Sequence, residues 1–120
     1  MKKCIVLVSN QSFSAENKSN TSSLNALLDA KKIKRVEVDG SAEDMVDRRN
    51  TLFGISGVRG SYPQVFLVDE GETTPRFIGL FDAIQHMNEM NDLPTDIIEQ
   101  NNILTFDAVF AGTSPRLDPP

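Results

Sequence analysis

Cysteine is nearly absent from the sequence, which contains only Cys4 among its 120 residues. A single thiol cannot form an internal disulfide, a Cys-x-x-Cys pair or a zinc-ribbon framework. Cys4 opens an apolar run at 4–8, and a free cysteine in such a run is often only a small hydrophobic residue. We therefore expect Cys4 to be structural, with a redox role as the alternative.

Long apolar runs and an excess of positive charge are also missing. No run approaches the roughly 18 residues that cross a bilayer, and the apolar part of the opening MKKCIVLV is too short for a secretion signal. The 12 Lys and Arg residues against 17 Asp and Glu residues give a formal net charge of −5. This balance argues against a general binder of nucleic-acid backbones. We expect a cytoplasmic protein without membrane or nucleic-acid partners.

Candidate metal ligands and basic patches are scarce as well. His86 is the only histidine, and with no second histidine or cysteine nearby we expect no metal site. The run at 31–35 contains Lys31, Lys32, Lys34 and Arg35. We interpret it as positive charge that complements the end of a helix, with a nucleic-acid patch as the alternative.

The residues that are present alternate between strand and helix signals. Apolar or alternating runs predict strands at 4–8, 36–38, 65–68 and 73–78, with Gly79 ending the last of them. A polar loop is expected at 9–21. Three apolar helical faces follow one another along the chain: the first is capped by Ser19, Thr21 or Ser22, the second begins with a Ser41–Asp44 capping box and ends near Gly54 or Gly57, and the third runs from Phe81 to about Leu93.

The predicted order is β-α-β-α-β-β-α. Strands joined through helices are expected to be parallel, and the hairpin turn at 69–72 predicts an antiparallel pair. This order predicts one α/β domain over residues 1–94, with a four-stranded mixed sheet between two helical layers. Residues 95–120 form an acidic C-terminal extension, which either packs on its own domain or mediates a weak homodimer.

Proline directly precedes the apolar run Gln64-Val65-Phe66-Leu67. Proline has no N–H for a sheet ladder, so it fits only at the start of this strand. The segment YPQVFL at 62–67, with the element order, resembles the thioredoxin-like fold in its glutaredoxin-like branch. In that family a cis proline precedes the third strand and faces the bound ligand. The resemblance implies a cis Tyr62–Pro63 bond and a ligand-binding role for both residues.

A second segment, RFIGLFDAI at 76–84, resembles the strand-end glycine and helix-start aspartate of glutaredoxins. The resemblance implies that Gly79 and Asp82 contact a ligand, with Asp82 binding the amino group of glutathione. The plain alternative for Asp82 is an N-terminal helix cap. Arg59 resembles the Gln or Arg that approaches the glycyl carboxylate of glutathione, although one extra residue separates it from Tyr62-Pro63.

The catalytic cysteine of glutaredoxins has no counterpart between the first strand and the first helix. Thiol–disulfide exchange needs a thiolate. A glutaredoxin-like chain without this cysteine resembles the SH3-domain-binding glutamic-acid-rich proteins, which are glutaredoxin-like and lack the catalytic cysteine. The resemblance rests on three segments: LNALLDAKKI at 24–33, PQVF at 63–66 and GLFDA at 79–83. Their proline-rich SH3 ligand is absent, because Gly60-Ser61-Tyr62 stands in its place.

These observations predict a non-catalytic module that binds a protein or peptide partner through the groove around Pro63, with no resident cofactor. Two alternatives stay open. The groove binds glutathione without chemistry, or the chain is a glutathione-dependent thiol–disulfide oxidoreductase that uses Cys4 as its nucleophile.

Overall fold

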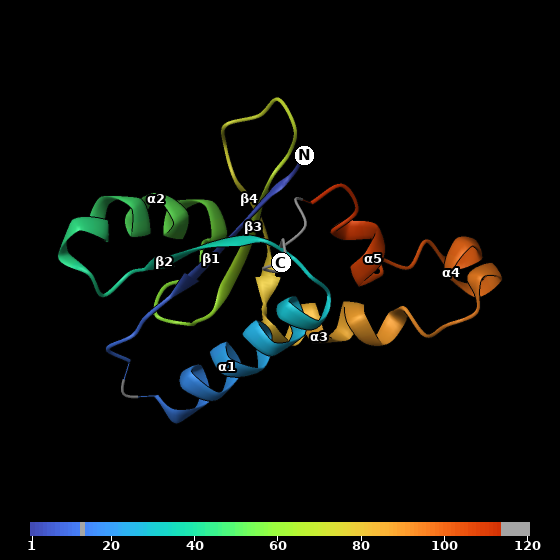
Figure 1. Cartoon of the computed structure of the whole chain (residues 1–120), viewed down its shortest axis with the longest axis horizontal. Coiled ribbons are helices and arrows are strands. Elements are labelled where there is room, and N and C mark those ends of the chain that lie inside the picture. The colour runs from blue at the N-terminus through green and yellow to red at the C-terminus, as the bar shows by residue number, and fades with distance from the viewer. Residues whose placement is uncertain (13, 114–120) are drawn as a thin grey trace, which may run out of the picture.

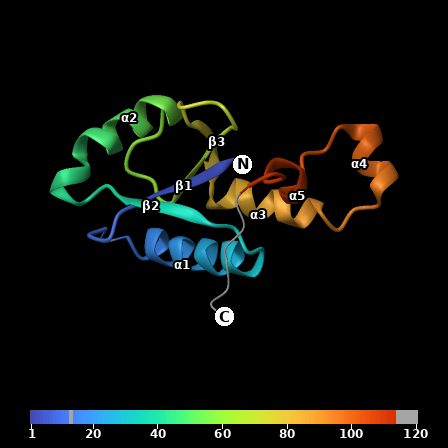
Figure 2. The same ribbon diagram turned by 45° about the horizontal axis from the view of Figure 1, so that its top comes forward.

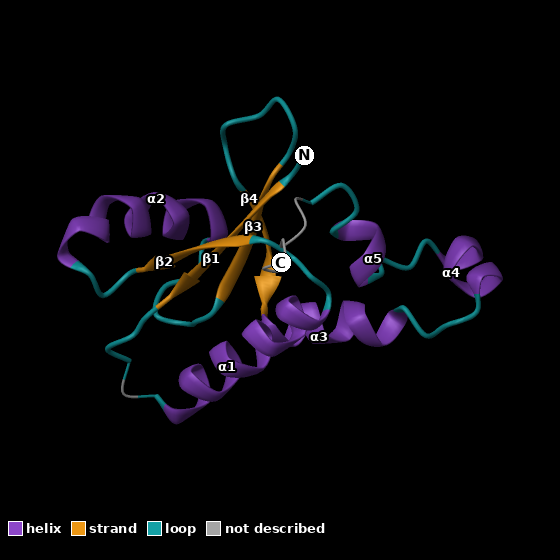
Figure 3. Ribbon diagram, in the orientation of Figure 1, coloured by secondary structure: helices purple, strands orange, loops and turns teal. Residues whose placement is uncertain are grey.

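A computed structural model describes residues 1–12 and 14–113 of the chain. It is a mixed α/β structure with a four-stranded sheet (Figure 1, Figure 3). The strands are β1 (Lys3–Val8), β2 (Arg35–Asp39), β3 (Gln64–Val68) and β4 (Arg76–Leu80). The helices are α1 (Ala15–Ala30), the 3₁₀ turn η1 (Glu43–Met45), α2 (Val46–Ser56), α3 (Phe81–Met90), α4 (Thr95–Asn101) and α5 (Phe106–Val109).

The strand order in the sheet is β2-β1-β3-β4, so β1 and β3 are internal. β1 pairs with β2 in parallel, whereas β1 with β3 and β3 with β4 are antiparallel. The expectation that helix-linked strands are all parallel is therefore wrong for β3. Gln64 at the start of β3 lies opposite Leu7 near the end of β1. The loop at 57–63 returns the chain to the end of the sheet where β1 and β2 finish. β3 therefore starts at that end and runs in the opposite direction.

The sheet is covered on both faces, by α2 on one and by α1 and α3 on the other (Figure 2). Successive side chains of a strand point to opposite faces, so β1 supplies both cores. Ile5 and Leu7 pack with Phe53 and Phe66 on the α2 side. The core on the α1 and α3 side contains Cys4, Val6, Val8, Leu24, Leu28, Ile33, Val65, Leu67, Ile84, Met87, Phe106 and Phe110.

Helix α1 begins earlier than its apolar pattern predicts. Ser14 is the N-cap, and its Oγ accepts a hydrogen bond from the Asn17 N–H at 3.2 Å. The expected cap among residues 19–22 is therefore wrong, and the second half of the expected loop is helical. Apolar periodicity marks only the buried part of a helix, here Leu24 and Leu28. The exposed first turns of α1 carry no such signal.

Other boundaries also differ from expectation. The Ser41 hydroxyl donates to Asp39 Oδ1 at 2.6 Å, and η1 has no side-chain cap, so the expected capping box is wrong. β4 begins at Arg76 rather than residue 73, and Gly79 lies inside it. Gly57 caps α2 with a φ of 71°, in the left-handed region that glycine adopts at little cost.

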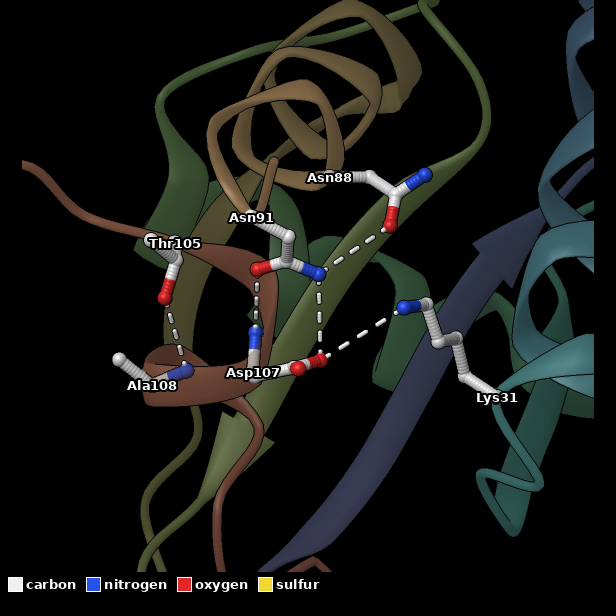
Figure 4. Close-up of polar contacts among 6 residues, drawn as sticks. All are labelled: Lys31, Asn88, Asn91, Thr105, Asp107 and Ala108. Carbon is white, nitrogen blue, oxygen red and sulfur yellow. Dashed lines mark hydrogen bonds and ion pairs between the residues drawn. The ribbon is translucent and has the colours of Figure 1, made fainter. Parts of the chain in front are cut away.

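The segment after α3 returns to the core through α5. Phe106 and Phe110 are 1% and 4% exposed, and their rings stack with centroids 4.3 Å apart. A polar cluster fastens α5 to its neighbours (Figure 4). Asn91, the C-cap residue of α3, accepts from the Asp107 N–H and donates to Asp107 Oδ1, both at 3.2 Å. Lys31 Nζ lies 3.6 Å from the same carboxylate oxygen. Residues 114–120 of the expected extension lie outside the described residues.

Candidate functional site

A small cavity lies between the first turns of α1, the Ser61-Tyr62 segment and the start of α3. Its volume is about 120 Å³, and its lining residues are Glu16, Asn17, Asn20, Ser61, Tyr62, Leu80, Phe81 and Asp82. The structure thus brings Tyr62 and Asp82, two of the predicted site residues, to one cavity. The three α1 residues come from the stretch expected to be a loop, so sequence reasoning missed them.

Tyr62 and Pro63 lead into β3. The peptide bond between them is cis, the isomer that the resemblance implies. Pro63 is buried, and the half-buried Tyr62 ring lies 6.2 Å from the Phe53 ring, centroid to centroid. Burial raises the pKa of the Tyr62 hydroxyl, while Arg49 and Asp39 exert smaller and opposite electrostatic effects on it. The Tyr62 hydroxyl is therefore uncharged at neutral pH, and Tyr62 forms part of the cavity wall.

Gln64 holds the Tyr62 segment in place, and this residue was not identified from the sequence. Its side chain is fully buried, and Nε2 donates to the Val58 and Ser61 carbonyls at 2.9 and 3.0 Å. These two bonds tie the loop before Pro63 to the first residue of β3. The available signal was a glutamine inside an apolar strand, because a buried amide needs hydrogen-bond partners close by.

Asp82 lies in the first turn of α3 with its side chain exposed. The N-cap of α3 is Leu80, which makes no side-chain capping bond, so the alternative that Asp82 is the cap is wrong. A carboxylate in the first turn still interacts favourably with the positive end of the helix dipole. Asp82 is thus held at the helix start and borders the cavity.

Gly79 does not line the cavity, but it sets the approach of β4 to α3. A Cβ atom at this position would come within 2.7 Å of the Ala83 Cβ. Only glycine therefore allows the end of β4 and the first turn of α3 to come this close. The close approach places Leu80, Phe81 and Asp82 at the cavity wall.

Arg59 lies apart from the cavity. Its side chain is exposed, and its guanidinium carbon is 5.6 Å from the centroid of the Phe53 ring. The Arg49 guanidinium carbon is 5.8 Å from the same ring. Arg59 is therefore not among the residues that line the cavity, although Phe53 beside it neighbours the lining residue Tyr62.

Cys4 belongs to the core and not to the cavity. It is 1% exposed within β1, and burial raises the pKa of its thiol to about 12 despite the nearby Arg35 charge. The cavity itself is bordered by two carboxylates, Glu16 and Asp82, and no Lys, Arg or His is among the described residues that line it. Its electrostatic character therefore favours a cationic group.

Neither a metal-binding cluster nor a membrane-spanning helix occurs among the described residues. No cluster of three His, Cys, Asp or Glu side chains there is arranged to hold a metal ion. Among the same residues, no helix combines the length and apolar character needed to cross a membrane. A larger hollow of about 620 Å³ lies between α2 and the 69–75 loop, but it contains none of the predicted site residues.

Comparison of the chain with models of known protein families and with curated protein sequences gave no match.

Proposed function

We propose that the chain is a non-catalytic, glutaredoxin-like binding module that holds the amine end of a peptide partner beside Tyr62-Pro63. The parallel β1–β2 pair, the antiparallel β3–β4 pair and the helices on both faces support a thioredoxin-like fold. The observation that carries the proposal is the single cavity lined by Tyr62, Asp82 and Glu16.

The chemistry of the lining selects the ligand. Two carboxylates, two Asn amides and the Ser61 and Tyr62 segment surround about 120 Å³. A water molecule takes about 30 Å³ of liquid volume, so the cavity has room for a terminal group rather than a whole ligand. A primary ammonium group offers three N–H donors and no acceptor, and it matches this acceptor-rich lining.

Chemistry on a disulfide needs an accessible thiolate. Cys4 is enclosed in the core, and its raised pKa leaves almost no thiolate at neutral pH. The module therefore binds its partner without forming a covalent bond to it.

Glutathione is a second candidate ligand, because it also carries a primary ammonium group that Asp82 could receive. Glutathione additionally carries two carboxylates, and the described lining of the cavity offers them no cation. Arg59, the residue expected to receive one of them, is stacked near Phe53 instead. We therefore expect free amino termini of peptides to bind more tightly than glutathione.

The test is an NMR titration of the ¹⁵N-labelled protein with triglycine, N-acetyl-triglycine and reduced glutathione. We expect saturable shifts of the Asn17, Tyr62 and Asp82 amides with triglycine and none with its acetylated form. Asp82→Asn should weaken triglycine binding about tenfold, since a hydrogen bond to a charged group contributes about 1.5–3 kcal/mol.

Asp96→Asn is the matched control, because Asp96 is also an exposed carboxylate in the first turn of a helix. It should leave the titration unchanged. Equal shifts from both triglycine forms would exclude the ammonium-binding cavity. A thiol-transferase activity that Cys4→Ser abolishes would show instead that the chain is an oxidoreductase.

A further inference from the structure

β2 is one of the two edge strands of the sheet, and β4 is the other. In the strand order β2-β1-β3-β4, β1 pairs with one side of β2, and no described strand pairs with the other (Figure 2). Val36, the second residue of β2, is 52% exposed, the largest exposed fraction of any aliphatic side chain on the described strands. An unpaired edge with an exposed apolar residue is a template for pairing with another strand.

The hydrogen-bonding groups of β2 alternate between its two sides. The Gly40 N–H, directly after β2, donates to the Val8 carbonyl at 2.8 Å and so points toward β1. Backbone groups of successive strand residues point to opposite sides. Val36 and Val38 therefore turn their N–H and C=O groups inward, and Arg35 and Glu37 turn theirs outward. The open edge presents the donors and acceptors of these two charged residues.

Charges of opposite sign, Arg35 and Glu37, flank Val36 in β2. The segment reads Lys34-Arg35-Val36-Glu37-Val38-Asp39, with cations before Val36 and carboxylates after it. In an antiparallel pair centred on Val36, Arg35 of each copy lies opposite Glu37 of the other. Charges on an edge commonly oppose pairing, but opposite charges directly across two strands stabilise it.

We propose that β2 is a self-complementary docking edge, through which two copies of this chain pair antiparallel about a two-fold axis at Val36. Arg35 and Glu37 exchange backbone hydrogen bonds with Glu37 and Arg35 of the second copy. The two Val36 side chains meet at the axis as a non-hydrogen-bonded pair, with Cα atoms about 4.5 Å apart. Arg35 keeps its own ion pair with Asp29, at 2.9 Å, while Glu37 of the second copy approaches from the open side.

Other registers fit the edge less well. A pair centred on Glu37 has the same hydrogen-bond phase and sets Arg35 opposite Asp39 of the other copy, but it places the two Glu37 carboxylates directly opposite each other at the axis. A pair centred on Arg35 likewise opposes two guanidinium groups. Like charges directly opposite destabilise a strand pair. The Val36 centre avoids both conflicts and gives a closed, isologous dimer.

Sedimentation velocity over a wide range of protein concentration tests the dimer. The weight-average mass should rise from 13.3 kDa toward twice that value. Glu37→Lys replaces both attractions by repulsions and should raise the dissociation constant about tenfold or more. It leaves the Arg35–Asp29 pair of each copy in place. Glu99→Lys, the same charge change on exposed α4, should have no effect.

Cross-linking tests the register. Val36→Cys should form an intermolecular disulfide rapidly on mild oxidation, because a Cα separation of about 4.5 Å suits that bond. Val46→Cys, at a site with 37% exposure on α2, should cross-link far more slowly, and the buried Cys4 gives little background in either variant. A chain that stays monomeric at millimolar concentration, or equal cross-linking of the two variants, would overturn the proposal.

Discussion

The buried Gln64 amide holds the Ser61 carbonyl at 3.0 Å, directly across the Tyr62–Pro63 bond. Its second bond reaches the Val58 carbonyl at 2.9 Å. One side chain of the first β3 residue thus fixes the loop that forms a wall of the cavity. The Oε1 atom of the same amide is buried without a hydrogen-bond partner among the described residues, so only the donor half of this side chain is satisfied.

Replacing Gln64 should destabilise the protein. Gln64→Leu removes both hydrogen bonds and leaves the Val58 carbonyl with only the Ser56 hydroxyl as donor, so we expect a loss of about 1–3 kcal/mol in the free energy of unfolding. Gln64→Glu places a carboxylate beside the same two carbonyls and should cost more at pH 7. Urea denaturation measures both. A variant Gln64→Glu as stable as wild type would contradict the assigned role.

Gly79→Ala should also be destabilising. The added Cβ would lie 2.7 Å from the Ala83 Cβ, and such overpacking typically costs about 1–3 kcal/mol. Gly54→Ala is the matched control, because a Cβ added there inside α2 meets no described side chain or other element within 4 Å. It should stabilise the helix by up to about 1 kcal/mol. Thermal and urea unfolding of the two variants should shift in opposite directions.

Phe106→Ala should destabilise the whole domain rather than only its C-terminal segment. Phe106 is 1% exposed and belongs to the core that contains Val65 and Leu24. Truncating a buried phenylalanine costs about 3–5 kcal/mol. Leu104→Ala, at a side chain 66% exposed, should change stability little. If the amides of β1 and α1 kept their hydrogen-exchange protection in Phe106→Ala, the shared core would be refuted.

Cys4 should react slowly in the folded protein. Its pKa is raised from 9.0 to about 12 by burial, so the folded state holds almost no thiolate at pH 8. Iodoacetamide labelling followed by mass spectrometry should be slow without denaturant and fast in urea, where the thiol is exposed. Rapid labelling of the folded chain would show that Cys4 is accessible and would reopen the oxidoreductase alternative.

Stability should depend on pH through Asp39. Hydrogen bonds from the Ser41 hydroxyl, and then from Asn10 and the Ser41 backbone, lower the pKa of this carboxyl below its usual 3.8. A lowered folded-state pKa stabilises the protein above pH 3.8 and ceases to do so as the carboxyl is protonated at lower pH. Wild type should therefore be more stable than Asp39→Asn at pH 6, and the difference should shrink toward pH 3. A constant difference between them would contradict this linkage.

The apolar strands and the third helix could be predicted because their buried residues form apolar runs or recur with the period of a helix. Val65, Phe66 and Leu67 are fully buried in β3, and Ile84 and Met87 are the buried residues of α3. The start of α1 could not be predicted in this way. Its first turns are polar and exposed, and the hydrogen bond from Asn17 to Ser14 that begins the helix resembles ordinary loop chemistry in the sequence.

The candidate site shows the same division. Tyr62 and Asp82 were identified from the sequence and line one cavity, whereas Arg59, identified in the same way, lies against Phe53. Glu16, Asn17 and Asn20 reach the cavity only because α1 begins early and passes beside α3. A linear pattern records residue type and spacing, but it contains no information on which helix start faces which loop.

The sequence by itself determined the class of the molecule: an acidic α/β chain with a buried central strand, a lone core cysteine and a proline at the entry to β3. Local propensity and apolar periodicity are sufficient for those conclusions. Tertiary structure alone decided the antiparallel direction of β3, the packing of α5 into the main core and the position of Glu16 and Asp82 at one cavity. These features depend on contacts between residues far apart in the chain. Several arrangements are equally compatible with the local sequence patterns, and loop geometry and side-chain packing select one of them.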